Sequence, residues 1–174
     1  MRLVIGFGNP GGTYNWTRHN FGALALDFYA KVNQLQWKTD KKFNIDLIKT
    51  GDIIFAKSHL FYNEVGIVIR KLTDYYKIDT THDLLIICDD INIDFGQLRF
   101  REHGSAGGNN GLKSTIQHLG HDDFQRLRLG TDNPSRTTLG DADFVLAKFT
   151  PEEKTQLPTI LLDVNSQIDA FLAQ

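Results

Sequence analysis

Apolar residues are arranged along this chain in two alternating patterns, short continuous runs and stripes with helical spacing. Residues 2–6 form a largely apolar run that ends in glycine, and the wholly apolar run 84–88 predicts a central strand of a buried sheet. Stripes in which apolar residues recur every three or four positions predict four helices. These helices are expected at residues 21–32, 65–76, 112–119 and 157–172.

Other segments have the patterns of further strands. Residues 42–49 and 52–58 flank Thr50-Gly51 and predict a hairpin, and two further strands are predicted at residues 97–101 and 124–129. The alternation of strands with helices predicts an α/β fold, a three-layer sandwich with a mixed, mostly parallel central sheet flanked by helices. No repeat or linker divides the sequence, so we expect a single domain spanning residues 1–174.

The amino-acid composition excludes several classes of protein. The chain has 174 residues, of which 41% are hydrophobic, enough for one core. No apolar run approaches the ~18–20 residues of a membrane helix, so no membrane partner is expected. The single cysteine, Cys88, excludes an internal disulfide and a multi-cysteine zinc site and fits a reducing cytoplasm. The net charge of −2 argues against a protein that coats nucleic acid without specificity.

Three segments that follow predicted strands are rich in Gly, Asn, His and Asp. They are residues 6–20, 89–96 and 103–111. In α/β folds ligands bind where the carboxyl ends of strands meet loops. We therefore predict that any functional site forms where these three segments converge.

The first of these segments contains a literal G-x-G-x-x-G, Gly6 to Gly11. A dinucleotide site needs a helix that begins at the third glycine, so that its N–H groups hold the pyrophosphate. Here Pro10 lacks an N–H, and the first residue with helical periodicity is Phe21. A dinucleotide-dependent oxidoreductase is therefore an unfavoured alternative, which would require a helix starting at Gly11.

His19 and Asp89 are the strongest candidates for catalysis. An imidazole titrates near neutral pH, so His19 is a candidate general base, although it could simply start a helix that Thr17 or Asn20 caps. Asp89 follows the apolar strand and could orient the imidazole, as in hydrolytic triads, or could start a turn. Spacing alone does not decide between these alternatives.

Other candidates are weaker. Asn63 precedes the second predicted helix and could be its N-cap, and the loop 104–111 could bind a substrate backbone or be a plain connection. Cys88 is a poor nucleophile because a buried apolar run raises a thiol's pKa. The histidines lack metal-ligand spacing, so no metal is expected.

Taken in order along the chain, these motifs resemble bacterial-type peptidyl-tRNA hydrolase. The resemblance rests on matches from residue 3 to about residue 154, which together are far more specific than any one motif. The matching motifs are Gly8-Asn9-Pro10-Gly11, Tyr14, Thr17-Arg18-His19-Asn20-Phe21-Gly22, Phe61-Tyr62-Asn63 with Gly66, Asp89-Asp90, Gly107-Gly108-Asn109-Asn110-Gly111-Leu112-Lys113, Phe124-Gln125-Arg126-Leu127-Arg128-Leu129-Gly130 and Phe144-Val145-Leu146-Ala147-Lys148-Phe149.

The resemblance implies an activity, a location and a set of site residues. It implies a cytoplasmic monomer that hydrolyses the ester between a peptide and the 3′ end of tRNA, with peptidyl-tRNA as partner and no metal or cofactor. In that scheme His19 activates water, Asp89 orients His19 and Asn9 completes the catalytic group. The substrate would be bound by Tyr14, Tyr62, Asn63, Asn109 and Asn110, and tRNA phosphate by Arg101, Lys113 and Arg128.

Three positions depart from the family pattern. Asn109 stands where the family has a histidine, Tyr62 where it has a methionine, and Asn92 where it often has an acid. With these departures, the sequence is also compatible with a non-catalytic RNA-binding relative of the family, of the kind that assists splicing. That alternative is favoured by Asn109 and by a group of arginines, Arg99, Arg101, Arg126 and Arg128, and disfavoured by the intact pair His19 and Asp89.

Overall fold

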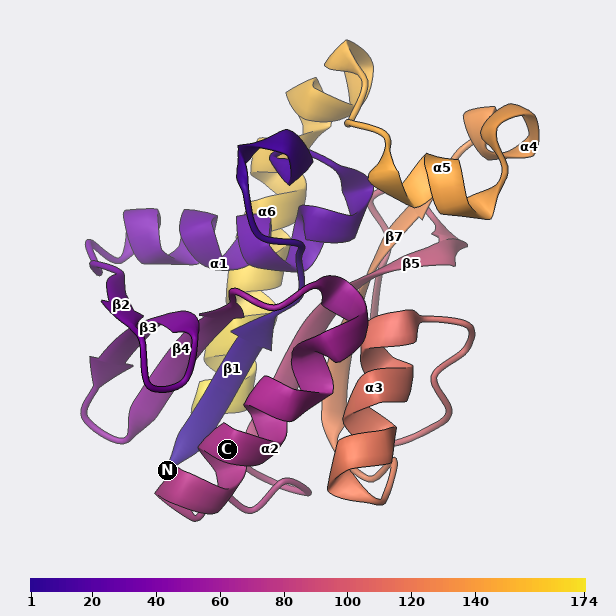
Figure 1. Cartoon of the computed structure of the whole chain (residues 1–174). Coiled ribbons are helices and arrows are strands. Elements are labelled where there is room, and N and C mark those ends of the chain that lie inside the picture. Colours follow the sequence, from indigo (N-terminus) through magenta and orange to yellow (C-terminus); the bar gives the residue numbers. More distant parts are fainter.

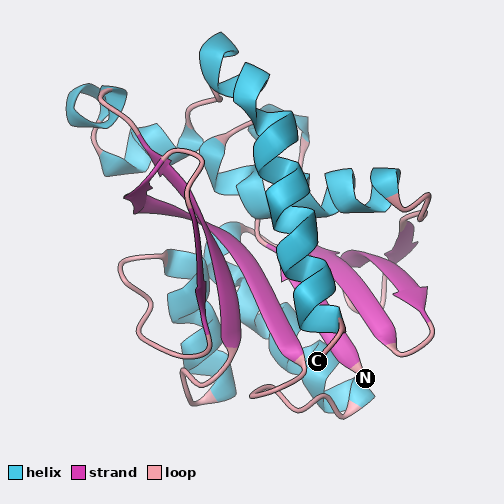
Figure 2. Ribbon diagram, turned by 180° about the vertical axis from the view of Figure 1, so that it is seen from behind, coloured by secondary structure: helices cyan, strands magenta, loops and turns pink.

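A twisted seven-stranded sheet forms the middle of the molecule (Figures 1 and 2). The computed structural model describes residues 1–174. The strand order is β2-β3-β4-β1-β5-β7-β6, in which β4, β1, β5 and β7 pair in parallel and β3 and β6 run the opposite way. The strands are β1 (Arg2–Gly6), β2 (Lys38–Asp40), β3 (Ile45–Thr50), β4 (Ile53–Ser58), β5 (Leu84–Asp94), β6 (Leu98–Arg101) and β7 (Gln125–Asp132).

Two pairs of helices cover the two faces of the sheet. One core cluster joins α2 (Val65–Tyr76) and α3 (Asn110–Leu119) to one face, and a second joins α1 (Phe21–Val32) and α6 (Pro151–Leu172) to the other. Figure 2 shows α6 lying along its face. Because each strand alternates its side chains between two apolar layers, the interior strands are apolar at nearly every position. The predicted three-layer α/β sandwich with a mixed, mostly parallel sheet is confirmed.

β5 differs from its prediction in length and place. The strand was expected to end at Cys88, but it continues to Asp94 and pairs with β7 beyond a register shift between Asp90 and Asp94. Polar composition suggested a loop, yet Gly130 of β7 lets the bulged backbone approach closely, since a Cβ there would lie 2.1 Å from the Asp94 carbonyl oxygen. The middle position of the sheet belongs to β1, and β5 lies beside it.

Several elements were absent from the prediction. They are β2, the short helices α4 (Ser135–Leu139) and α5 (Asp141–Leu146), and the first turn of α6. α4 and α5 bury only Phe144, so they carry no hydrophobic stripe. α6 begins at Pro151 with a capping box between Thr150 and Glu153. No helix in the structure combines the length and apolarity that crossing a membrane requires.

The start of α1 lies in direct backbone contact with the segment after β1 and with Ile87 of β5. The Phe7 N–H donates to the Ile87 carbonyl, and the Ala23 N–H donates to the Phe7 carbonyl, both at 2.9 Å. A Cβ on Gly22 would lie 2.1 Å from the Ile87 carbonyl oxygen. Only glycine allows this approach, which brings the turn before α1 next to Ile87–Asp89 of β5.

A buried ion pair anchors the same turn from the opposite side. The Arg18 guanidinium, 1% exposed, lies 2.7 Å from the Glu153 carboxylate and 4.3 Å from the centroid of the Phe144 ring. It also donates to the carbonyls of Ala147 and Lys148. Arg18 therefore ties the 3₁₀ turn Arg18–Asn20 to the connection between α5 and α6.

Replacing Gly22 with alanine tests the backbone contact. A Cβ at this position has no space and no flexible neighbour to displace, so we expect Gly22→Ala to lower the free energy of unfolding by about 3 kcal/mol. Gly12→Ala is the matched control, because nothing lies closer than 4.0 Å to its Cβ position. Urea denaturation measures both, and equal midpoints for the two variants would contradict the contact.

The Arg18 anchor is tested by Glu153→Gln, which keeps an acceptor for the Thr150 N–H but leaves the Arg18 charge buried without a counterion. An uncompensated buried charge costs about 3–5 kcal/mol. The adjacent exposed Glu152→Gln should leave the urea midpoint close to that of the wild type. A small change of the urea midpoint in Glu153→Gln would show that the ion pair contributes little to the free energy of unfolding.

Candidate active site

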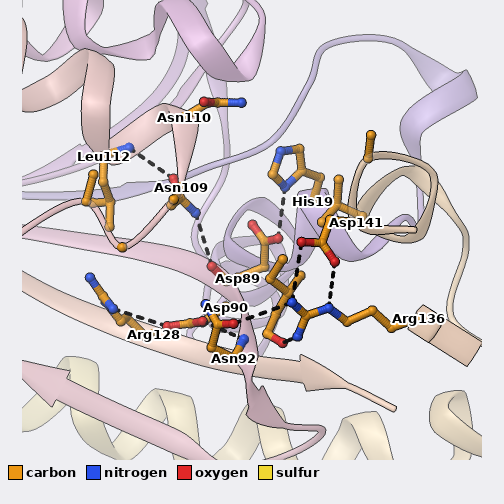
Figure 3. A pocket seen from close by; sticks show the side chains of 16 residues that line it. His19, Asp89, Asp90, Asn92, Asn109, Asn110, Leu112, Arg128, Arg136 and Asp141 are labelled. Carbon is orange, nitrogen blue, oxygen red and sulfur yellow. Dashed lines mark hydrogen bonds and ion pairs between the residues drawn. The ribbon is translucent and has the colours of Figure 1, made fainter. Parts of the chain in front are cut away.

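The three predicted segments meet at one cavity of ≈330 Å³, which is lined in part by Asp89–Asn92 of β5 and Arg128 of β7 (Figure 3). The prediction that they converge is therefore confirmed. Residues 136–145, which the sequence analysis did not include, close another side. The lining residues are His19, Asp89, Asp90, Ile91, Asn92, Ala106, Gly107, Gly108, Asn109, Asn110, Leu112, Arg128, Arg136, Asp141, Ala142 and Val145.

His19 and Asp89 are in direct contact at this cavity. The Nδ1 atom of His19 lies 2.8 Å from the Oδ2 atom of Asp89, within the range of a charge-assisted hydrogen bond. Asp89 is 2% exposed and the His19 side chain 15% exposed. Nε2 of His19 has no hydrogen-bond partner in the protein, so this nitrogen is free to act on a molecule in the cavity.

Tyr62 lies beneath His19 and shares the Asp89 carboxylate. Its hydroxyl is 2.6 Å from Asp89 Oδ1, and its ring stacks on the imidazole with centroids 3.6 Å apart and planes inclined by 6°. Burial and then the Asp89 charge raise the pKa of the Tyr62 hydroxyl, so it stays protonated. Tyr62 is 3% exposed and does not line the cavity.

Asn109 joins this group from the start of α3. Its Oδ1 accepts the Leu112 N–H at 3.0 Å, so it is the N-cap of the helix. Its Nδ2 donates to the Tyr62 hydroxyl at 2.7 Å and to the Asp89 carbonyl at 3.1 Å. A single side chain therefore caps a helix and contacts both supports of His19.

Asn9 is held rigidly beside the same group. Its backbone N–H donates to the Asn20 side chain at 2.8 Å, and its carbonyl accepts from that side chain at 2.9 Å. Its own Oδ1 accepts the Tyr62 N–H at 2.8 Å, which leaves Nδ2 without a protein partner. Thr17 and Asn20 occupy the N-cap positions of the 3₁₀ turn Arg18–Asn20 and of α1, as the structural alternative predicted, but neither side chain makes a capping hydrogen bond.

Of the other predicted substrate residues, only Asn110 lines the cavity. Asn110 is exposed, begins α3 and lines the cavity. Asn63 is exposed in the 3₁₀ turn Tyr62–Glu64 and does not cap α2, whose N-cap is Glu64. Tyr14 is partly buried and packs edge-on against Phe61 with ring centroids 6.2 Å apart, outside the cavity lining.

The predicted phosphate-binding residues differ in whether their charges are already paired with carboxylates. Arg128 lines the cavity, 3.2 Å from the Asp90 carboxylate, and also donates to the Ser105 carbonyl. Arg101 lies exposed on the edge strand β6, and Lys113 lies exposed on α3. Neither makes an ion pair with a carboxylate, so both cations face solvent.

Arg126 is unavailable to RNA. Its side chain is fully buried over the Phe124 ring and donates to the carbonyls of Gly104, Asp122 and Phe124. Burial followed by the nearby Arg128 charge lowers its pKa to about 10. Its inclusion among RNA-binding arginines is therefore wrong, because it holds the loop between β6 and α3.

The alternative chemistries do not fit. α1 begins at Phe21, and Gly11, with φ of 97°, precedes only a short 3₁₀ turn, so the helix that a dinucleotide site needs is absent at Gly11. Burial raises the pKa of the Cys88 thiol and makes it a poor nucleophile. No group of three or more His, Cys, Asp or Glu side chains is arranged to hold a metal ion.

Two residues at the site, Arg18 and Arg136, were not among the predicted site residues. Arg18 positions His19 through the buried pair with Glu153, and its place in the Thr17-Arg18-His19 motif was the available signal. Arg136 lines the cavity, paired with Asp141 at 2.7 Å. Nothing in the local pattern around Arg136 indicates a site.

Comparison with known proteins identifies one family for this chain. The peptidyl-tRNA hydrolase family model matches residues 3–174. A peptidyl-tRNA hydrolase of Bacillus cytotoxicus is 42% identical over 172 residues, covering 97% of this chain and 88% of the relative. That of Levilactobacillus brevis is 37% identical over 157 residues, covering 88% and 83%.

Solved structures agree with the sequence comparison. A peptidyl-tRNA hydrolase in complex with N-propanol has a TM-score of 0.90, and the peptidyl-tRNA hydrolase of Acinetobacter baumannii one of 0.89. Each is 25% identical and covers 99% of this chain and 89% of its own. With a family model, relatives and folds in agreement over nearly its whole length, the chain belongs to the peptidyl-tRNA hydrolase family.

Proposed function

We propose that this protein hydrolyses the ester bond between a peptide and the 3′ end of tRNA, with His19 as general base and Asp89 orienting it. The observation that carries the proposal is the contact of 2.8 Å between His19 Nδ1 and the buried Asp89 carboxylate, with Nε2 left free at the cavity. Asp89 accepts the Nδ1 proton, so Nε2 holds a lone pair and can take a proton from water.

The proposed reaction needs a base, a water and donors for the oxyanion. Water attacks the ester carbonyl while its proton passes to Nε2, and the tetrahedral intermediate collapses as the imidazolium returns that proton to the ribose oxygen. Asp89 stabilises the imidazolium between these steps. General base catalysis contributes about 10²–10⁴-fold, and one oxyanion donor about 10²–10³-fold.

Side-chain amides suit the remaining tasks. Asn9 has a free Nδ2 on a rigid backbone, so it is the best placed donor for the oxyanion or the adjacent peptide carbonyl. Asn110 at the cavity, the exposed Asn63 and the partly buried Tyr14 would bind the peptide and the terminal adenosine. Amides bind the peptide backbone whatever its side chains, which a general recycling enzyme requires.

The tRNA would be held by a few phosphate contacts. Arg101 and Lys113 are exposed and free of carboxylates, and Arg128 is available at the cavity at the expense of its pairing with Asp90. Few contacts suffice to position a tRNA without reading its sequence, so a net charge of −2 is compatible with this role. We further propose that the enzyme acts in the cytoplasm as a monomer, without metal or cofactor.

The assignment of the base is tested with purified protein and N-acylated aminoacyl-tRNA. His19→Ala should lower kcat by at least about 100-fold, and Asp89→Asn by a similar factor through the wrong imidazole tautomer. His82→Ala is the matched control, because His82 makes a similar contact with Asp79 at 3.2 Å on the exposed surface. Tight RNA binding without turnover by the wild type would instead identify a non-catalytic RNA-binding relative.

The phosphate contact is tested by the salt dependence of KM. Arg101→Ala should raise KM for peptidyl-tRNA about fivefold at low salt, flatten its dependence on ionic strength and leave kcat unchanged. Arg70→Ala removes an equally exposed arginine that is paired with Asp74 on α2 and should change neither quantity. Identical salt slopes for Arg101→Ala and the wild type would remove Arg101 from the RNA surface.

A further inference from the structure

Two of the three positions at which the chain departs from its family pattern touch each other inside the site. Tyr62 and Asn109 are joined by a hydrogen bond of 2.7 Å, and both contact Asp89 (Figure 3 shows Asn109, Asp89 and His19). The hydrogen bond to Tyr62 is not what fixes Asn109 in the fold, because Asn109 already caps α3. The contact therefore points to a joint role at Asp89.

The direction of every hydrogen bond among Asn109, Tyr62 and Asp89 follows from the N-cap contact at the start of α3. The Leu112 N–H must find an acceptor, so the Asn109 amide turns its oxygen to the helix and its nitrogen to Tyr62. An amide nitrogen only donates, so the single proton of the Tyr62 hydroxyl goes to Asp89 Oδ1. The protonated state of Tyr62 agrees with this direction.

The same logic sets the tautomer of His19. With one oxygen of Asp89 occupied by the tyrosine proton, the other accepts the Nδ1 proton of His19 at 2.8 Å. Nε2 is left as the basic nitrogen facing the cavity. The chain of bonds thus runs from the N-cap of α3 to the base, and the stacked Tyr62 ring fixes the plane of the imidazole.

We propose that Tyr62, oriented by Asn109, is a positioning residue that holds Asp89 and sets the basicity and orientation of His19, rather than a residue that binds substrate. The inference rests on the proposed hydrolase function for its kinetic consequence, but not for its structural one. Tyr62 is 3% exposed and lies outside the cavity lining, so a substrate in the cavity meets His19 and not the tyrosine.

The other charged groups around His19 are already paired. Arg128 pairs with Asp90, Arg136 with Asp141 and Arg18 with Glu153, and Cys88 is a buried thiol whose pKa is raised by burial. Removing the Tyr62 hydroxyl changes none of these pairs. A change in the titration of His19 in such a variant therefore reports the lost hydrogen bond to Asp89.

The experiment follows the imidazole proton signals of His19 by NMR as a function of pH. In Tyr62→Phe the ring stack remains but Asp89 loses a donor, so its charge acts more strongly on the imidazolium. We expect the midpoint of the His19 titration to move up by about 0.5–1 pH unit. Asn109→Ser keeps an N-cap acceptor, but its shorter side chain does not reach the Tyr62 hydroxyl, and it should move the midpoint the same way by less.

Tyr29→Phe is the matched control. It removes another tyrosine-to-carboxylate hydrogen bond, 2.7 Å long and made to Asp169 between α1 and α6, and should leave the His19 midpoint unchanged. The double variant of Tyr62→Phe and Asn109→Ser should titrate like Tyr62→Phe alone, because both changes break one chain of bonds. An unchanged midpoint in folded Tyr62→Phe overturns the proposal. If that variant does not fold, Asn109→Ser decides, since an upward shift supports the proposal and no shift overturns it.

Kinetics separates positioning from substrate binding. Tyr62→Phe should lower kcat about tenfold on the pH-independent plateau of the rate profile and leave KM for N-acylated aminoacyl-tRNA unchanged. A raised KM with unchanged kcat would assign Tyr62 to substrate binding and overturn the proposal. If the wild type lacks hydrolytic activity, the proposed function fails, while the NMR titration still decides the role of Tyr62.

Discussion

The backbone contact between the start of α1 and Ile87 of β5 is the constraint on which the site depends. Gly22 lies against the Ile87 carbonyl, two residues before Asp89, and His19 lies three residues before Gly22. Any side chain at Gly22 would force these segments apart, because its Cβ would lie 2.1 Å from the Ile87 carbonyl oxygen. The contact of 2.8 Å between imidazole and carboxylate is thus a consequence of how closely a helix can approach a parallel pair of strands.

A buried carboxylate makes the rest of the polar network necessary. Asp89 is 2% exposed at the end of an apolar strand, where an unpaired charge would cost several kcal/mol. One oxygen has the Nδ1 proton of His19 and the other the Tyr62 hydroxyl, so the cost of burial is offset by two hydrogen bonds. The same burial strengthens the field of Asp89 at the imidazole, so the stability of the site and its chemistry have one physical origin.

Sequence patterns predicted what depends on local periodicity. The two apolar runs, four helical stripes and the convergence of three segments follow from rules of spacing, and His19 with Asp89 followed from chemistry and family resemblance. The extension of β5 to Asp94 depends on Gly130 in another strand, and α4 and α5 depend on the burial of Phe144 alone. Local composition carries no signal for either. The pair of Arg18 with Glu153 joins residues 135 positions apart, and only the fold brings them together.

The same limit explains why Tyr62 and Asn109 look like separate anomalies in the sequence. Judged singly, a tyrosine in place of methionine alters an apolar wall, and an asparagine in place of histidine removes a titratable group. In the structure the two residues complement each other. The amide nitrogen of Asn109 can only donate to the Tyr62 hydroxyl, so the single proton of that hydroxyl goes to Asp89. The two substitutions therefore form one polar unit whose direction is fixed by a helix N-cap. That fixed direction leaves the lone pair of His19 Nε2, rather than that of Nδ1, facing the cavity.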